Sequence, residues 1–291
     1  MRRTFFACLA VLAMACQAHA ADIVWVSFHA DDAGSAAATT AGLTSAADIG
    51  YTNLLSANGH SVTRLQTGEF DASSTAVLDQ MNAADLVIIS RSVPSNHYDG
   101  GNTAFWNTLV TAPVMNLGGY TLRSSRLNFT DGTDMPDTTG DVSVSVANPA
   151  HPIFAGVTLT DGKVHYASNV EEPLLATSTQ RGISVNANTA VNGTVLASVV
   201  DNTTTGFAIA EWTAGASLNN GDVLAGNRLV FLTGSREASG ITSETAGLYD
   251  LTDSGATMFL NAVNYMAVPE PASFGMLTLG LAGFALRRRG R

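Results

Sequence analysis

The sequence predicts an α/β domain in which helices cover both faces of a mainly parallel sheet, and three observations support this prediction. Apolar runs of strand length alternate along the chain with segments of helical periodicity. Glycine and polar turn residues separate these segments. The core strands are continuously apolar, which is typical of strands that are buried on both faces of a parallel sheet.

The first half of the chain supplies four of the predicted strands and three helices. The first strand is an apolar run that ends at the polar sequence HADDAG. The first helix ends at Gly59, a residue type that commonly terminates helices. In chain order, the segments are strand 21–28, helix 45–58, strand 60–66, helix 74–84, strand 85–92, helix 102–112 and strand 113–119.

The second half begins with a different pattern. From residue 120 to about residue 226 the chain is rich in Thr, Asn, Gly and Val, which predicts strands and turns. These predicted strands have the sequences GDVSVSV, KVHYAS, RGISVNA, TVLASVV and GFAIAEW. A core strand at 227–235 and a helix at 252–267 return to the earlier pattern. With right-handed crossovers, we predict one flavodoxin-like layered domain, residues 21–267, with a β-rich insertion at about 120–226.

The N-terminus has the three-part layout of a secretory signal peptide, residues 1–20. Arg2 and Arg3 precede an apolar run, and the small-residue sequence Ala18-His19-Ala20 follows it. The charged region is short, which favours ordinary Sec export over twin-arginine export. Both cysteines of the chain fall inside this segment. The exported domain therefore has no cysteine for a disulfide, a thiolate metal site or a nucleophile.

The exported segment is strongly acidic. Between Ala21 and Val268 it contains eight basic and 23 acidic residues, a formal net charge of −15. Such a surface repels a phosphate backbone, so we expect no nucleic acid among the partners, and it favours cations.

The last 24 residues, 268–291, combine a Pro-Glu-Pro sequence, a short apolar segment and a cluster of arginines. The prolines keep the chain extended and exposed before the apolar segment. A helix over residues 272–286 would be about 22 Å long, which is short of the roughly 30 Å hydrocarbon core of a bilayer. The arginines after it favour a cytoplasmic C-terminus. The residues that define the pattern are Pro269, Glu270, Pro271, Arg287, Arg288 and Arg289.

This three-part tail resembles the PEP-CTERM sorting signal of Gram-negative bacteria. The resemblance implies recognition by an exosortase in the inner membrane, transient anchoring by the transmembrane helix 272–286 and cleavage near Pro-Glu-Pro. It also implies delivery to the surface or matrix of cells that make exopolysaccharide. A plain membrane anchor is the alternative, although an anchor needs no Pro-Glu-Pro and usually has a longer span.

Five segments of the domain resemble the trehalose-utilisation-type domain of the class I glutamine amidotransferase-like superfamily. They are YTNLLSANGHSVTRL, ADLVIISRSVPS, NPAHPIFAGV, GNRLVFLTGS and LTDSGATMFLNAVNYM. The resemblance implies a flavodoxin-like fold and carbohydrate-associated roles, but no defined reaction. Catalytic relatives carry a nucleophile on the turn after a central strand, where this chain has Leu117, Gly118 and Gly119. That place holds no nucleophile, which argues against a glutaminase mechanism.

Candidate site residues follow three predicted core strands, where ligands of open α/β sheets collect. The histidine and carboxylates after the first strand suit a divalent cation or acid–base chemistry, and the alternative is a solvated loop. After the third strand, a histidine is a further catalytic candidate and a Tyr-Asp pair suits contacts to a sugar, the alternative being a polar surface loop. A serine after the last core strand is a candidate nucleophile, although such serines more often turn the chain. These residues are His29, Asp31, Asp32, His97, Tyr98, Asp99 and Ser235.

Four aspartates within eleven residues form a further candidate site. Their hard oxygen ligands suit calcium, although the spacing differs from an EF-hand loop and the closing glutamate is missing. The alternative is a flexible acidic loop. The residues are Asp131, Asp134, Asp137 and Asp141.

Three functional hypotheses follow. The leading one is an exported, exosortase-sorted protein of the cell envelope or biofilm matrix, with a non-catalytic domain that binds carbohydrate such as exopolysaccharide. The second is a metal-assisted, carbohydrate-active hydrolase of the same fold. The third is a matrix or adhesion protein that calcium stiffens.

Overall fold

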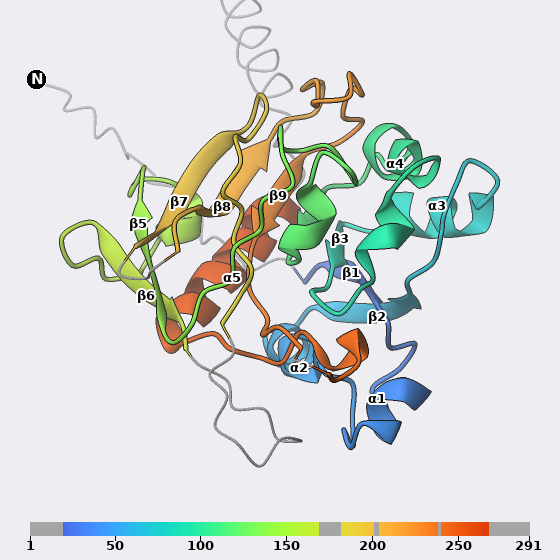
Figure 1. Ribbon diagram of the computed structural model, residues 1–291, viewed down its shortest axis with the longest axis horizontal. Helices are drawn as coiled ribbons and strands as arrows, with labels where there is room; N and C mark the ends of the chain where they lie inside the picture. Colours follow the sequence, from blue (N-terminus) through green and yellow to red (C-terminus); the bar gives the residue numbers. More distant parts are fainter. Residues whose placement is uncertain (1–19, 169–181, 201–203, 238–239, 268–291) are drawn as a thin grey trace, which may run out of the picture.

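The computed structural model describes residues 20–168, 182–200, 204–237 and 240–267, which form one layered domain (Figure 1). The predicted signal peptide, apart from its last residue, lies outside the described residues. So does the sorting tail from residue 268 onwards, with its predicted helix at 272–286.

A single nine-stranded sheet runs through the described part, in the order β2-β1-β3-β4-β9-β8-β7-β5-β6. The five strands β2, β1, β3, β4 and β9 are parallel to one another, in an order typical of doubly wound α/β sheets. The predicted α/β class is confirmed. The strands are β1 (Asp22–Ser27), β2 (Ser61–Gln66), β3 (Leu86–Ile89), β4 (Val114–Asn116), β5 (Val142–Val146), β6 (Lys163–Ala167), β7 (Thr194–Val200), β8 (Phe207–Trp212) and β9 (Arg228–Phe231).

The predicted β-rich insertion continues this sheet. Its strands β8, β7, β5 and β6 pair antiparallel beyond β9, so the parallel and antiparallel pairings are equal in number among the described strands. The sequence RGISVNA, predicted as a strand, forms only isolated bridges at Ser184 and Asn186. The insertion therefore extends the sheet beyond β9 with antiparallel strands.

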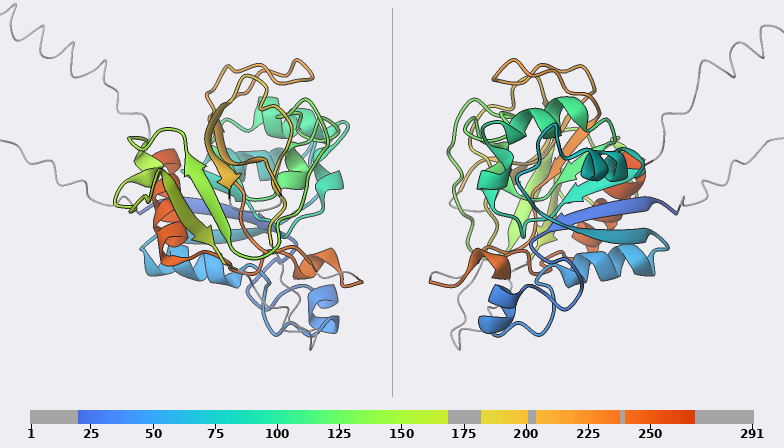
Figure 2. Two further views of the ribbon diagram at one scale, coloured as in Figure 1. Left: turned by 60° about the vertical axis from the view of Figure 1, so that its left-hand side comes forward. Right: turned by 90° about the vertical axis from the view of Figure 1, so that its right-hand side faces the viewer.

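Helices cover both faces of the parallel half (Figure 2). Helices α2 (Ile49–Ala57) and α5 (Asp253–Ala267) lie on one face, where the rings of Tyr51 and Phe259 are 5.5 Å apart. Helix α3 (Thr75–Asn82) and the short α4 (Asn102–Ala104) lie on the other. The remaining turns are α1 (Ala36–Thr40) and the 3₁₀ segments η1 (Ser95–Tyr98), η3 (Gly119–Leu122), η4 (Pro152–Phe154) and η5 (Ser243–Thr245).

The predicted helix at 102–112 is interrupted, which corrects the sequence prediction. After α4 the chain forms a π-helical turn, η2 (Phe105–Leu109). The buried guanidinium of Arg228 donates hydrogen bonds to the carbonyl oxygens of Trp106 at 2.9 Å and of Val110 at 2.6 Å. These carbonyl oxygens accept hydrogen bonds from a side chain at least 118 positions away in the sequence. The local sequence of the helix therefore gives no sign of the interruption.

The parallel strands give the domain two functionally different edges. The residues after β1, β3, β4 and β9 meet at what we call the carboxyl edge, and the starts of the same strands form the amino edge. Open α/β sheets bind ligands at the carboxyl edge. The side chains that follow these four strands are therefore the candidates for a functional site.

Candidate functional site

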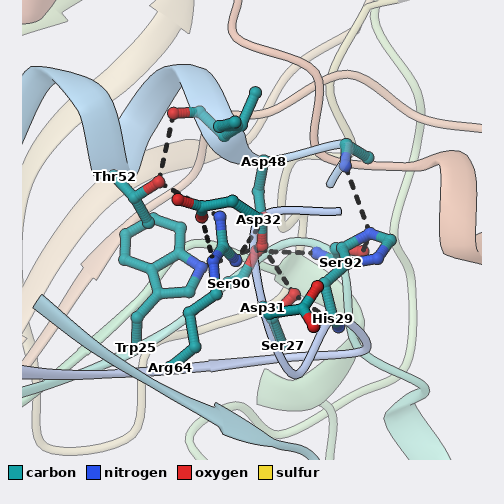
Figure 3. A network of polar contacts seen from close by, with 12 residues as sticks. Trp25, Ser27, His29, Asp31, Asp32, Asp48, Thr52, Arg64, Ser90 and Ser92 are labelled. Atoms are coloured by element: carbon teal, nitrogen blue, oxygen red, sulfur yellow. Dashed lines mark hydrogen bonds and ion pairs between the residues drawn. The ribbon is translucent and has the colours of Figure 1, made fainter. Parts of the chain in front are cut away.

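The polar centre near the end of β1 is the carboxylate of Asp48, which is completely buried (Figure 3). Its Oδ2 accepts hydrogen bonds from Trp25 Nε1 at 2.8 Å, Ser27 Oγ at 2.7 Å and Ser90 Oγ at 2.6 Å. Its Oδ1 accepts one from Arg64 at 2.8 Å. The carboxylate is therefore both hydrogen-bonded and paired, as a buried charge must be.

Arg64, on β2, connects this buried carboxylate to the surface. A second nitrogen of its guanidinium, Nε, donates to Asp32 at 2.7 Å. The side chain of Asp32 is 67% exposed, whereas that of Asp48 is fully enclosed. Burial acts to raise the pKa of Asp48, but Arg64 and the hydrogen bonds from its neighbours outweigh burial and lower the pKa below its usual value. Asp48 is therefore a charged structural centre.

His29 lies in the same network, and its ring is completely enclosed. Its Nδ1 accepts a hydrogen bond from the backbone N–H of Ser35 at 2.8 Å, and its Nε2 accepts one from the backbone N–H of Ala47 at 3.2 Å. Nε2 lies 3.3 Å from Ser92 Oγ. Burial lowers the pKa of His29, and the charge of Asp48 opposes this only in part. The neutral ring therefore holds the loop between β1 and α2 in place.

Ser92 and His29 have the spacing of a nucleophile and its base, but the arrangement does not suit catalysis. Nε2 already accepts the backbone N–H of Ala47, and both side chains are enclosed, out of reach of a substrate. Asp31 caps its own loop, because its Oδ1 accepts from the backbone N–H of Ala33 at 2.9 Å. The structure thus keeps His29, Asp31 and Asp32 on one loop but gives each a different neighbour.

A second polar group, which we call the arginine cluster, lies at the ends of β3 and β4 and consists of Arg91, Tyr120, Arg123 and Arg126. The guanidinium carbons of Arg91 and Arg123 lie over the Tyr120 ring, 5.5 Å and 5.1 Å from its centre. Cation–π contacts of this kind hold guanidinium groups without neutralising them. The Oγ of Ser95 accepts from both Arg123 and Arg126, at 3.1 Å and 3.4 Å.

Two glycines, which have no side chain, leave the space that the side chain of Arg91 occupies across the strand ends. A Cβ added to Gly234 would lie 3.0 Å from Arg91 Cβ, and one added to Gly118 would lie 3.8 Å from Arg91 Cδ. Gly234 also has a φ of +85°, which favours glycine. The guanidinium then reaches Glu237, with Nη2 3.0 Å from Oε2. Arg91 therefore reaches from the end of β3 to the segment that follows β9.

The arginine cluster carries excess positive charge in an acidic domain. Arg91 pairs with Glu237, and Arg126 lies 3.3 Å from Asp99. Within the described ranges, no carboxylate lies at ion-pair distance from Arg123. Burial and the neighbouring charge of Arg126 lower the pKa of Arg123. Among the residues that the structure describes, three guanidinium groups thus face two carboxylates, and one bound anionic group would balance them.

Ser235, the candidate nucleophile, follows β9 beside this cluster. Its Oγ is buried and lacks a hydrogen-bond partner among the residues described. The Nε atoms of Arg91 and Arg236 are unpartnered in the same way. Buried polar atoms without partners are rare in proteins, and three of them lie at or next to the end of one strand. This makes the end of β9 the part of the carboxyl edge whose polar groups are least satisfied internally.

The loop after β3 orients its predicted site residues in different directions. Tyr98 is completely buried, with its ring 5.0 Å from that of Trp106, so it is not available to stack on a sugar. The turn η1 directs it into the core, which corrects the expectation of an exposed ring. His97 Nδ1 lies 3.3 Å from Thr67 Oγ1. Asp99 alone joins the rim of the arginine cluster.

Three of the four candidate calcium ligands have separate partners. Arg236 lies 2.6 Å from Asp137, Asp131 accepts from a backbone N–H, and Asp141 is 3.8 Å from a histidine. The described part of the chain contains no group of three or more His, Cys, Asp or Glu side chains arranged to hold a metal ion. Calcium binding by Asp131, Asp134, Asp137 and Asp141 stays a prediction.

The decisive comparison concerns the tail. Residues 267–289 match the model of the PEP-CTERM protein-sorting motif. The protein is exported and sorted at the membrane by exosortase. Within the ranges that the structure covers, no helix has the length and apolar character needed to cross a membrane. No curated protein matches the sequence.

Two solved structures are similar to the chain at low identity. Cytoplasmic protein STM3548 of Salmonella typhimurium is 11% identical with a TM-score of 0.43, over 84% of this chain and 98% of that one. Cytoplasmic protein STM1381 of Salmonella typhimurium LT2 is 13% identical with a TM-score of 0.46, over 84% and 99% of the two chains. The resemblance to amidotransferase-like domains stays a prediction.

Sequence reasoning missed the residues that form both polar centres. Asp48 was predicted only as part of a helix, and its role depends on donors from three strands. The arginine cluster did leave a signal, because YTLRSSR places two of the eight basic residues of an acidic domain directly after a core strand. Two neighbouring arginines in an acidic domain are therefore a sequence signal for a candidate anion site.

Proposed function

We propose that the domain of this sorted protein binds acidic polysaccharide of the cell envelope or matrix at the arginine cluster, without cleaving it. The observation that carries the proposal is Arg123, a guanidinium held over Tyr120 with no carboxylate partner in the part of the chain described. A uronate carboxylate accepts two parallel hydrogen bonds from one guanidinium, which gives geometric specificity as well as charge.

The location of the arginine cluster supports a ligand site. At the ends of β1 and β3, the Asp48 network and His29 fill the carboxyl edge with enclosed side chains. After β4, by contrast, Tyr120, Arg123 and Arg126 all retain partial exposure. The open part of the edge is therefore the positively charged part.

Two features support binding without catalysis. Leu117, at the position where amidotransferase-like relatives carry a nucleophile, is buried and apolar. Both nitrogens of the neutral His29 ring accept backbone N–H groups, and the ring and Ser92 are enclosed, which leaves this pair without access to a substrate. Binding without cleavage agrees with both observations.

The test compares acidic and neutral polysaccharides on the exported protein purified from its host. We expect binding to polygalacturonate that weakens with added salt, and little binding to dextran. Arg123→Gln removes a hydrogen-bonded charge, worth about 1.5–3 kcal/mol, so its affinity should fall roughly 10- to 150-fold.

Lys163→Gln is the matched control, because it removes one positive charge from an exposed position on the distant strand β6. Its affinity should stay close to that of the unmodified protein. Equal binding of dextran and polygalacturonate, or equal losses in the two variants, would reject the arginine cluster as the site.

A further inference from the structure

The folded domain begins and ends at the same edge, the amino edge. Strand β1 starts there at Asp22, whose register partner Ser61 is also the first residue of its strand. Helix α5 begins near the carboxyl edge, since Asp250 just before it accepts from the backbone N–H of Gly234. Both views of Figure 2 show the start of β1 and the end of α5 on one side of the molecule.

The end of α5 is firmly attached at the amino edge. The hydroxyl of Tyr265 donates to Glu211 at 3.0 Å, and Glu211 is in register with Leu229 at the start of β9. One turn earlier, Asn261 Nδ2 donates to the carbonyl oxygens of Ile153 at 3.1 Å and Ala155 at 2.8 Å. The buried side chains of the helix continue to its last two residues. The helix therefore leaves no loose turn between the domain and the tail.

The tether between the domain and the predicted membrane segment is very short. The sorting motif starts at residue 267, which is also the last residue of α5. Four residues, 268–271, separate the helix from the apolar segment at 272, and fully extended they span at most about 14 Å. A compact domain of this size has a radius of gyration of about 18 Å, equivalent to a sphere roughly 46 Å across. The tether is shorter than the radius of the domain, so the domain cannot turn over.

We infer that, while the tail is held in the membrane, the domain stands with its amino edge against the lipid surface and its carboxyl edge pointing away. The contact is imposed by the short tether and not by affinity, because the edge itself carries the carboxylates of Asp22 and Asp85. This orientation follows from the topology and the sorting motif alone. Combined with the proposed function, it leaves the arginine cluster open to polysaccharide before cleavage.

Single cysteines provide the test, because the folded domain contains none. Thr213→Cys introduces an exposed thiol at the amino edge. It directly follows Trp212, the last residue of β8, which is in register with Arg228, the first residue of β9. Thr40→Cys introduces one at the end of α1, which follows the carboxyl end of β1. The full chain is produced in host cells without exosortase, and spheroplasts are labelled with a bulky, membrane-impermeant maleimide. The chain without an added cysteine gives the background.

We expect Thr213→Cys to label several-fold more slowly in the membrane-held form than in the cleaved form from exosortase-containing cells. Thr40→Cys should label at the same rate in both. Insertion of 20 Gly/Ser residues after Ala267 gives a mean reach of about 25 Å and should restore the labelling of Thr213→Cys. Three results would overturn the inference. They are equal labelling rates of Thr213→Cys in the membrane-held and cleaved forms, slower labelling of Thr40→Cys in the membrane-held form, and release of the uncleaved chain into the medium. None of these readouts depends on polysaccharide binding.

Discussion

Asp48→Asn is the substitution that tests the centre of the fold most directly. The change keeps the size of the side chain but removes its charge. In the carboxylate, Oδ2 accepts from Trp25, Ser27 and Ser90 while Oδ1 accepts from Arg64. An amide must turn its NH₂ group either toward the three donors or toward the guanidinium, so at least one donor loses its acceptor whichever way it is oriented.

The expected cost follows from burial. Removing one partner of a buried ion pair typically destabilises a protein by about 3–5 kcal/mol. Asp32→Asn is the matched control, because it breaks the other ion pair of the same arginine at a carboxylate that is 67% exposed. Exposed pairs contribute less than about 1 kcal/mol. Urea unfolding of both variants at neutral pH, followed by near-UV circular dichroism, measures the difference.

The pH dependence gives a second check. The folded pKa of Asp48 lies below its usual value of 3.8, so the charged form stabilises the fold fully above that value and loses this effect as the pH falls through the folded pKa. Asparagine does not titrate, so the difference in the free energy of unfolding between the unmodified protein and Asp48→Asn should narrow on acidification. A loss below about 1 kcal/mol for Asp48→Asn, or the same loss as for Asp32→Asn, would refute the reasoning.

Two further predictions concern residues at the carboxyl edge. Gly234→Ala places alanine at a φ of +85° and brings its Cβ 3.0 Å from the side chain of Arg91. Gly221→Ala is the control, because its φ is +86° but its Cβ would meet no atom within 4 Å. The positive φ alone costs about 1–2 kcal/mol in each variant. The Gly234 variant should therefore lose roughly 1–3 kcal/mol more in urea unfolding, and equal losses would exclude the packing role. Because burial lowers the pKa of His29, the unfolded chain binds its proton first, and stability should fall as the pH drops below 6.5. His29→Gln should flatten this dependence in urea midpoints measured on either side of that pH, and an unchanged slope would exclude His29 as its source.

The core strands were predictable from sequence because their signal is local. The apolar runs at 21–28, 85–92 and 227–235 each contain one parallel strand, and the alternation with helices predicted the α/β class. The final helix was placed within one residue of its start, since Met258, Val263 and Met266 repeat at helical spacing on its buried side. Burial and periodicity were sufficient in these segments.

Contacts between distant segments account for what the sequence did not indicate. The break after α4 depends on Arg228, and the inward direction of Tyr98 depends on a ring contact to Trp106. The same holds for Asp48, whose donors come from three strands. Candidate residues chosen by type alone, such as His29, were assigned chemistry that their neighbours in the fold do not support.

The insertion has a role beyond lengthening the sheet. Arg91 comes from the parallel half, but Tyr120, Arg123 and Arg126 belong to the first turns of the insertion, directly after β4. A Cβ on Gly119 would lie 2.9 Å from the carbonyl oxygen of Ser184, so the insertion closes tightly on its own beginning. This packing fixes η3 and with it the cations that it carries. The parallel sheet therefore supplies one guanidinium and the rigid strand ends, and the insertion supplies the unpaired charge, so an anion site at this edge requires both parts of the domain.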